Sequence, residues 1–117
     1  MIEISYRDFE KKVLDCELPV FVCFTTEWCH SCFPTCLLAD QLGREYDDRV
    51  KFVRLDKEKS PEIAEKYCII AVPTILIFRN TQELHRFIGF PDRSDLRSTL
   101  DSLVAESELP HRQKEKE

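Results

Sequence analysis

The sequence predicts an α/β domain in which helices cover both faces of a mixed β-sheet, in the order βαβαβαββα. Residues 19–25 ("PVFVCFT") and 74–78 ("TILIF") are almost entirely apolar. Strands of this composition are typical of a sheet that is covered on both faces. Amphipathic helical patterns stand between the strand-like segments. Because strands separated by a helix are expected to pair in parallel while a hairpin adds an antiparallel edge, the sheet should be mixed.

The N-terminal part of the chain contains two predicted strands, each followed by a helix. Residues 2–5 ("IEIS") are strand-like, and Ser5 with Asp8 predicts a capping box that begins the first helix. The strand over 19–25 comes next, and the second helix follows Trp28. The apolar faces of these two helices consist of Phe9, Val13 and Leu14, and of Leu38, Leu42 and Tyr46.

The C-terminal part adds a strand, a short helix, a hairpin and a last helix. Residues 50–56 ("VKFVRLD") alternate as a strand does, and residues 60–62 ("SPE") predict an N-cap, a proline at the first helical position and a first-turn acid. The polar turn "RNTQE" joins the strand over 74–78 to an outer strand over 84–88 ("LHRFI"). A last helix begins after Asp92, with an apolar face of Leu96, Leu100, Leu103 and Val104.

Size, charge and hydropathy restrict the class of protein and its partners. The 117 residues suit one domain over 1–106, followed by a disordered tail over 107–117. The net charge of −5 argues against a nucleic-acid partner. No apolar stretch approaches the roughly 18 residues that span a bilayer, so no membrane partner is expected. The first residues lack the features of a secretory signal, so we expect a cytoplasmic protein, and a monomer because nothing marks a large apolar surface.

The segment "TTEWCHSCFPTC" contains three of the six cysteines. In a reducing compartment such cysteines indicate catalysis or metal binding rather than a disulfide scaffold. Cys29 lies where a buried strand ends and a helix begins, and free amides there stabilise a thiolate. Cys32 lies one turn later, within reach of a disulfide, so Cys29 could attack a substrate disulfide and Cys32 could resolve it. His30 either stabilises the thiolate when protonated or is an ordinary exposed residue.

The spacing C-x2-C-x3-C leaves a metal site open as an alternative. Cys36 lies one turn beyond Cys32, so three thiolates with His30 or His85 could bind zinc or part of an iron–sulfur cluster. Alternatively, Cys36 is a small core-facing residue. Cys23 and Cys68 are expected to fill space in the core, and the sequence predicts neither a buried nor an exposed position for Cys16.

Three segments resemble the thioredoxin family. "FVCFTTEWCHSC" is similar to its active-site strand and turn, "AVPTILIF" to its cis-proline segment, and "FIGFPDRSDL" to its passage through a glycine into the last helix. The resemblance covers about residues 2–106 in the family's order. It implies the thioredoxin fold and a thiol–disulfide oxidoreductase that reduces protein disulfides without a cofactor or metal. Such an enzyme is recharged by an upstream reductase or other electron donor.

The resemblance also implies roles for the residues around the two cysteines. Cys29 would be the nucleophile and Cys32 the resolving cysteine. Trp28 would lie beside the thiols as a lid, and the Val72–Pro73 bond would be cis, with the backbone of Val72 offered to an extended substrate. The residues implied in orienting the substrate are Trp28, His30, Ser31, Val72 and Pro73.

The sequence departs from the family pattern next to this site. Cys23 stands in place of a buried aspartate, Phe52 in place of a lysine, and Ser31 in place of a proline. Pro34 falls in the first turns of the helix, where it should deprive the His30 carbonyl of its amide donor and bend the helix. Glu27 is either a substitute base or an exposed carboxylate. These losses leave open a binding module of the same fold with a vestigial CxxC.

Overall fold

In the computed structural model, which describes the backbone of residues 1–116 and the side chains of residues 1–106, five strands form one mixed sheet. They are β1 (Ile2–Ile4), β2 (Val20–Thr25), β3 (Lys51–Asp56), β4 (Thr74–Arg79) and β5 (Gln82–Ile88), in the spatial order β1-β3-β2-β4-β5. The helical elements are α1 (Tyr6–Phe9), the π-helix η1 (Glu10–Leu14), α2 (Cys32–Glu45), α3 (Pro61–Lys66) and α4 (Arg93–Lys116). The predicted α/β class and order of elements are confirmed.

The direction of β4 differs from the prediction. β3 pairs in parallel with both β1 and β2, as expected for strands joined through helices. β4, however, is antiparallel to β2, although α3 separates it from β3. Thr74 pairs with Phe24 and Asp56 pairs with Thr25, so β4 enters the sheet from the end at which β3 leaves it. A parallel strand would need a connection that runs back along the sheet, and the six-residue α3 does not provide one.

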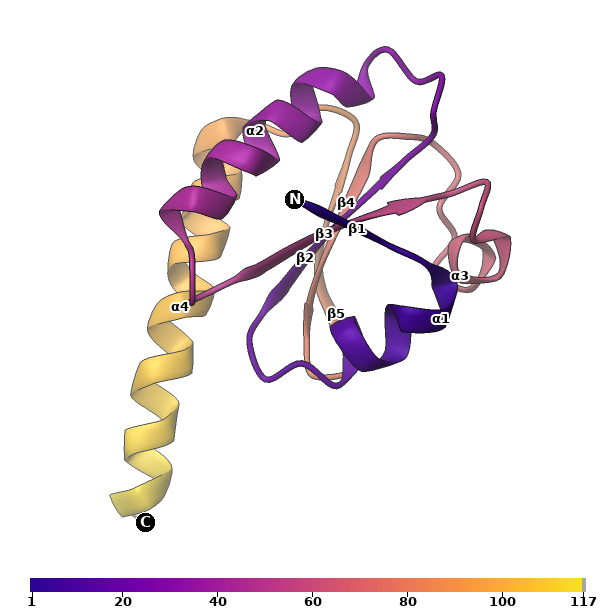
Figure 1. Ribbon diagram of the computed structural model, residues 1–117. Coiled ribbons are helices and arrows are strands. Elements are labelled where there is room, and N and C mark those ends of the chain that lie inside the picture. Colours follow the sequence, from indigo (N-terminus) through magenta and orange to yellow (C-terminus); the bar gives the residue numbers. More distant parts are fainter. Residues whose placement is uncertain (117) are drawn as a thin grey trace.

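The helices form a layer on each side of the sheet, as predicted. Figure 1 shows α2 and α4 on one side of the sheet and α1 and α3 on the other. The strand β2 serves both layers because successive side chains point to opposite faces. Phe21 and Cys23 belong to the core under α2 and α4, whereas Val20, Val22 and Phe24 belong to the core under α1, η1 and α3. This is why the whole strand is apolar.

The predicted capping box at the first helix is wrong. The Ser5 hydroxyl makes no hydrogen bond to the helix backbone and instead lies 3.5 Å from a carboxylate oxygen of Asp8. The amide of Asp8 donates to the Ser5 carbonyl at 3.1 Å, which closes the first turn without the side chain. The apolar face itself is as predicted, since Phe9 and Val13 are buried.

Pro34 does not have the predicted effect on the His30 carbonyl. Because α2 begins at Cys32, Pro34 is its third residue, where an amide has no acceptor within the helix. The His30 carbonyl accepts a hydrogen bond from the amide of Phe33 at 3.2 Å. The proline therefore occupies a position where its missing N–H removes no helical hydrogen bond.

The last helix packs its predicted face against the sheet. Leu96, Leu100 and Leu103 are buried, and the Asp92 carboxylate accepts the amide of Asp95 at 3.0 Å at the start of the helix. The backbone of α4 continues to Lys116. The side chains of residues 107–117 lie outside the described residues, so the tail assigned to that range stays a prediction.

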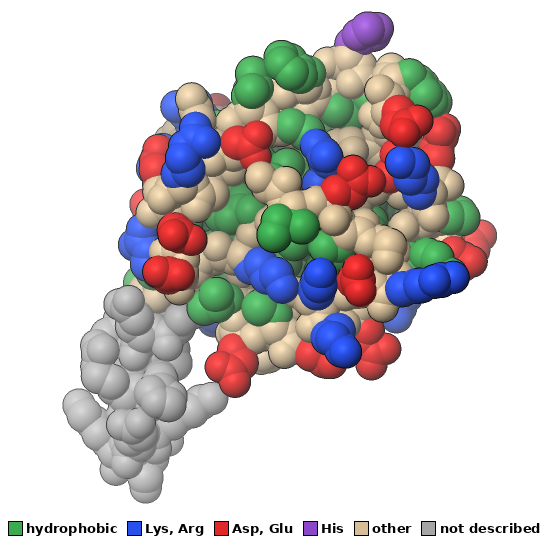
Figure 2. Space-filling view, viewed as in Figure 1, with side chains coloured by type: hydrophobic (Ala, Val, Ile, Leu, Met, Phe, Trp, Pro, Cys, Tyr) green, Lys and Arg blue, Asp and Glu red, His purple; other side chains and the backbone are tan. Residues whose placement is uncertain are grey.

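The surface of the molecule carries both signs of charge. Figure 2 shows acidic and basic side chains interspersed over one face, without a continuous basic patch of the kind that binds nucleic acid. Within the described part of the chain, no helix is both long and apolar enough to cross a membrane.

Candidate functional site

Cys29 and Cys32 are joined by a disulfide in the turn between β2 and α2, here called the active-site disulfide. Their Cα atoms are 5.4 Å apart, so the predicted disulfide reach is confirmed. The amide of Cys29 donates to the Thr26 carbonyl at 3.4 Å, and that of Cys32 donates to the Cys29 carbonyl at 3.2 Å. Cys29 therefore lies in a turn just before the helix rather than on its first residue.

The two sulfur-bearing residues differ in exposure. Cys32 is buried, with 4% of its surface exposed, whereas Cys29 is half-buried. A partner molecule can therefore reach Cys29 more easily than Cys32. His30 and Ser31 between them are exposed, and the Ser31 hydroxyl lies 3.5 Å from the Cys29 sulfur.

The segment before β4 lies at the same end of the sheet. The Val72–Pro73 peptide bond is cis, Pro73 is buried and Val72 is half-buried. Thr74, the next residue, pairs with Phe24 near the end of β2. The amide of Gly89 donates to the Pro73 carbonyl at 2.8 Å. The fold thus brings Val72 and Pro73 to the sheet end that carries the active-site disulfide.

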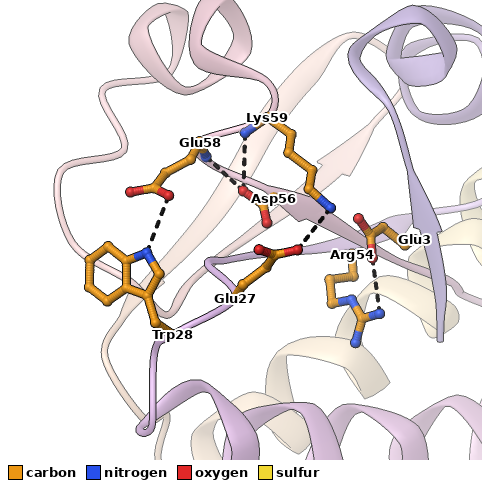
Figure 3. A network of polar contacts seen from close by, with 7 residues as sticks. All are labelled: Glu3, Glu27, Trp28, Arg54, Asp56, Glu58 and Lys59. Carbon is orange, nitrogen blue, oxygen red and sulfur yellow. Dashed lines mark hydrogen bonds and ion pairs between the residues drawn. The ribbon is translucent and has the colours of Figure 1, made fainter.

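Trp28 is held by the loop that follows β3 (Figure 3). Its indole N–H donates to the Glu58 carboxylate at 3.3 Å. Asp56 orders this loop, because one of its carboxylate oxygens accepts the amides of Glu58 and Lys59 at 2.8 and 3.1 Å. The tryptophan nevertheless remains 68% exposed, beside the disulfide rather than in the core.

Glu27 is a surface carboxylate, the second of the two alternatives. Its carboxylate pairs with the Lys59 ammonium at 3.2 Å, and both side chains are mostly exposed. Figure 3 shows this pair beside the Asp56 loop. An exposed ion pair of this kind contributes little to stability, and nothing in its surroundings favours a role as a buried base.

An open groove of about 670 Å³ runs beside the disulfide. It is lined by apolar residues and by charges of both signs. Among the lining residues are Cys29, Cys32, Cys36, Arg54, Asp56 and Lys59.

Two further cysteines lie at this groove: Cys36 lines it, and Cys23 is buried on β2. Cys36 and Arg54 line the groove together, and Cys23 is paired with Arg54 in the sheet, so the three side chains come from neighbouring positions. The neighbouring Cys23, and after it Arg54, lower the pKa of Cys36 to about 6, although partial burial acts in the opposite direction. The neighbouring Cys36 and deep burial raise the pKa of Cys23 well above its ordinary value.

Sequence reasoning missed Arg54, which lines the groove with Cys36 and is paired with Cys23 in the sheet. Cys23 is buried in the core, as predicted, and Cys36 is half-buried. A signal was present in "VKFVRLD", because Arg54 is a charged residue two positions after Phe52 on the covered face of the strand. Arg54 also pairs with Glu3 at 3.1 Å, so its charge is shared between an acid and a thiol.

The core-filling prediction for Cys68 is wrong. Cys68 follows the end of α3 with a φ of 56°, and its side chain is exposed. The next residue, Ile69, takes the buried position in the core with only 4% of its surface exposed. Cys16 is half-buried against the core under α1 and η1.

The geometry gives no support to a metal site on Cys29, Cys32 and Cys36. Among the described residues, no group of three or more histidine, cysteine or acidic side chains could hold a metal ion. Two of the three sulfurs are bonded to each other.

Comparisons with known proteins agree with this arrangement. The family model described as Thioredoxin matches residues 1–102. A thioredoxin from Synechocystis sp. is 34% identical over 102 residues, which cover 87% of this chain and 95% of that protein. Thioredoxin 1 of Synechococcus elongatus is 32% identical over 98 residues, covering 84% and 92%. The chloroplastic thioredoxin M4 of Arabidopsis thaliana is 31% identical over 103 residues, covering 88% of this chain and 53% of the relative.

Proposed function

This chain belongs to the thioredoxin family and is a thiol–disulfide oxidoreductase, and from that premise we propose that it reduces disulfides in protein substrates with Cys29 as the nucleophile and Cys32 as the resolving cysteine. The observation that carries the proposal is the difference in exposure across the disulfide. The half-buried Cys29 is open to a substrate, and the buried Cys32 is reached from within the protein.

The reaction proceeds in two exchange steps. In the reduced protein the Cys29 thiolate attacks one sulfur of the substrate disulfide, forms a mixed disulfide and expels the other substrate sulfur as a thiolate. Cys32 then attacks the Cys29 sulfur, which forms the active-site disulfide and releases the second substrate thiol. Two electrons pass to the substrate in each cycle.

The neighbours of Cys29 supply the stabilisation that its thiolate needs. The Ser31 hydroxyl, 3.5 Å from the Cys29 sulfur, donates to the thiolate once the disulfide is open. A protonated His30 adds a positive charge on the exposed side. Both residues stand in the turn that a substrate approaches.

Substrate orientation falls to the residues that surround the exposed sulfur. Trp28, fixed through Glu58, provides a flat apolar surface beside Cys29. The Val72–Pro73 segment lies at the same sheet end, where its backbone can pair with an extended substrate chain. Together with His30 and Ser31, these residues define the substrate-orienting set.

The partners follow from the chemistry of the pair. Disulfide-containing proteins are the substrates, and an upstream reductase or other electron donor restores the dithiol. The dithiol carries both electrons, so the reaction needs no organic cofactor. We place the protein in the cytoplasm, since four free cysteines among its six suit a reducing compartment. A monomer stays the expected oligomeric state.

The test compares single cysteine variants in the reduction of a disulfide-containing protein by dithiothreitol. Cys29→Ser should abolish turnover. Cys32→Ser, first reduced and then freed of dithiothreitol before the substrate is added, should trap mixed disulfides that a nonreducing gel resolves. Cys68→Ser is the matched control, because this thiol is exposed outside the groove, and it should keep full activity. Full activity of Cys29→Ser would overturn the assignment and favour a binding module with a vestigial CxxC.

A further inference from the structure

We propose that Phe33 and Leu37 form an apolar subsite, here called the helix subsite, which binds an apolar side chain next to the attacked cysteine of a protein substrate. The proposal rests on the function proposed above for the active-site disulfide and adds a specificity-determining surface to it. The helix subsite lies in the groove beside the disulfide, whose described lining residues include neither Trp28 nor the Val72–Pro73 segment. It is therefore a second contact surface, distinct from the substrate-orienting set.

Two large apolar side chains of α2 are exposed to solvent. Phe33 is 67% exposed and Leu37 is 51% exposed. They stand four residues apart, so they are neighbours on the helix surface, and both line the groove together with Cys29 and Cys32. The buried face of α2 is supplied by other residues, among them Leu38. Adjacent exposed apolar side chains of this kind mark an interaction site rather than part of the core.

The chemistry at Cys29 identifies the occupant of this subsite as the substrate itself. In the mixed disulfide the substrate cysteine is bonded to Cys29, and Cα atoms joined in this way lie about 4.4–6.8 Å apart. A helix rises about 1.5 Å per residue, so Leu37 lies about 7.5 Å along α2 from Cys32. An extended chain advances about 3.3–3.6 Å per residue. Substrate residues a few positions from the attacked cysteine therefore reach Phe33 and Leu37.

The charges of the groove favour an apolar ligand side chain over a charged one. The Arg54 guanidinium is paired with the Glu3 carboxylate at 3.1 Å, and the Lys59 ammonium is paired with the Glu27 carboxylate at 3.2 Å. One carboxylate oxygen of Asp56 accepts two amides of the loop that follows it. A charged substrate side chain would compete with these contacts, whereas an apolar one gains by covering the exposed helix subsite.

The experiment compares two disulfide-linked peptides that differ only beside the cysteine. One carries leucines on both sides of its cysteine, the other carries serines there, and both have the same charged ends. Fully reduced protein, freed of reductant, is mixed with each peptide, and chromatography of the released thiol peptide gives the rate constant. Wild type should reduce the leucine peptide faster by about tenfold, the lower end of what an apolar contact gives in an enclosed pocket, because this groove is open.

The variant that tests the subsite is the double substitution Phe33→Ala with Leu37→Ala. Both side chains are exposed, so the variant should fold, and its preference for the leucine peptide should fall close to one. Leu84→Ala is the matched control, because Leu84 is also exposed but lies on β5, outside the groove. This control should keep the preference of wild type.

The outcomes separate this proposal from the one on which it rests. Equal rates for the two peptides in wild type, or an unchanged preference in the double variant, would overturn the helix subsite and leave the proposed function intact. Reduction of neither peptide by wild type would overturn both. Equal rates together with a wild-type dimer that the double variant cannot form would assign Phe33 and Leu37 to a second copy of the chain, and would overturn their role in substrate binding.

Discussion

The two faces of the sheet use the same strands for different purposes. Under α1, η1 and α3 the core is apolar and aromatic, and the Phe78 ring meets Phe9 and Tyr67 at centroid distances of 5.8 and 5.3 Å. Under α2 and α4 the apolar core is interrupted by the Cys23 and Cys36 thiols, with Arg54 beside them. The first face supplies stability, and the second carries chemistry as well.

This division depends on the alternation of side chains along β2. Phe24 and Val22 point to the aromatic face, and Cys23 between them points to the thiol face. A reactive group can therefore lie within a central strand without interrupting the core on the other side. Substitutions on the two faces should then have separable effects.

The largest effect is expected from Phe78→Ala on the aromatic face. Phe78 is fully buried, and truncation of a buried phenylalanine costs about 3–5 kcal/mol through lost burial and the cavity left behind. Urea denaturation should show this loss in the free energy of unfolding, while the folded variant keeps the wild-type alkylation profile of Cys36.

The matched control is Phe33→Ala, since the Phe33 side chain is 67% exposed. A surface substitution of this kind changes the free energy of unfolding by no more than about 0.5 kcal/mol. If Phe78→Ala altered the reactivity of Cys36 in the folded protein, the two faces would not be independent.

Sequence patterns predicted the layers of the fold but not the direction of every strand. The alternation and apolar runs predicted all five strands of the described chain, because burial on a sheet acts residue by residue. The direction of β4 depends on where the loop after α3 returns the chain, and a connecting helix alone does not fix that. The rule that strands joined through a helix run parallel therefore does not hold for β4, which is antiparallel to β2.

The site shows the same limit. Spacing placed Cys29 and Cys32 within disulfide reach, because four consecutive residues restrict how far apart two side chains can lie. Whether Cys36 lies near Cys23 and Arg54 depends on how α2 is rotated over β2, which is set by packing of the whole layer. No local pattern encodes that rotation.

A smaller effect, confined to the thiol face, is expected from Arg54→Gln. Below about pH 6 the Cys36 thiol is protonated and should react slowly with iodoacetamide, and above it the thiolate should react fast. Cys23 is the largest influence that lowers the pKa of Cys36, and the Arg54 guanidinium is a further one. Removing the guanidinium should therefore raise this pKa, and the alkylation rate at pH 6 should fall several-fold because less of the thiol is ionised. Cys23 and Asp40 also act on this thiol and stay in place.

Lys59→Gln is the control for Arg54→Gln, because Lys59 lines the same groove but pairs with Glu27. The pH dependence of Cys36 alkylation in this variant should match that of wild type. It is measured by mass spectrometry while Cys29 and Cys32 are joined in the active-site disulfide. Equal changes in both variants would mean that the groove's overall charge, rather than the contact with Arg54, controls the thiol.

The smallest effect is expected from Tyr46→Phe, at the far end of α2 from the disulfide. The buried Tyr46 hydroxyl donates to the Asp101 carboxylate, and burial followed by this contact raises the pKa of Tyr46 to about 12. Loss of one such hydrogen bond should cost about 1 kcal/mol in urea denaturation, because exposed Asp101 regains water. Exposed Tyr6→Phe is the control and should change less. An altered Cys36 alkylation profile in Tyr46→Phe would mean that the whole α2 layer, and not the groove alone, tunes the thiols.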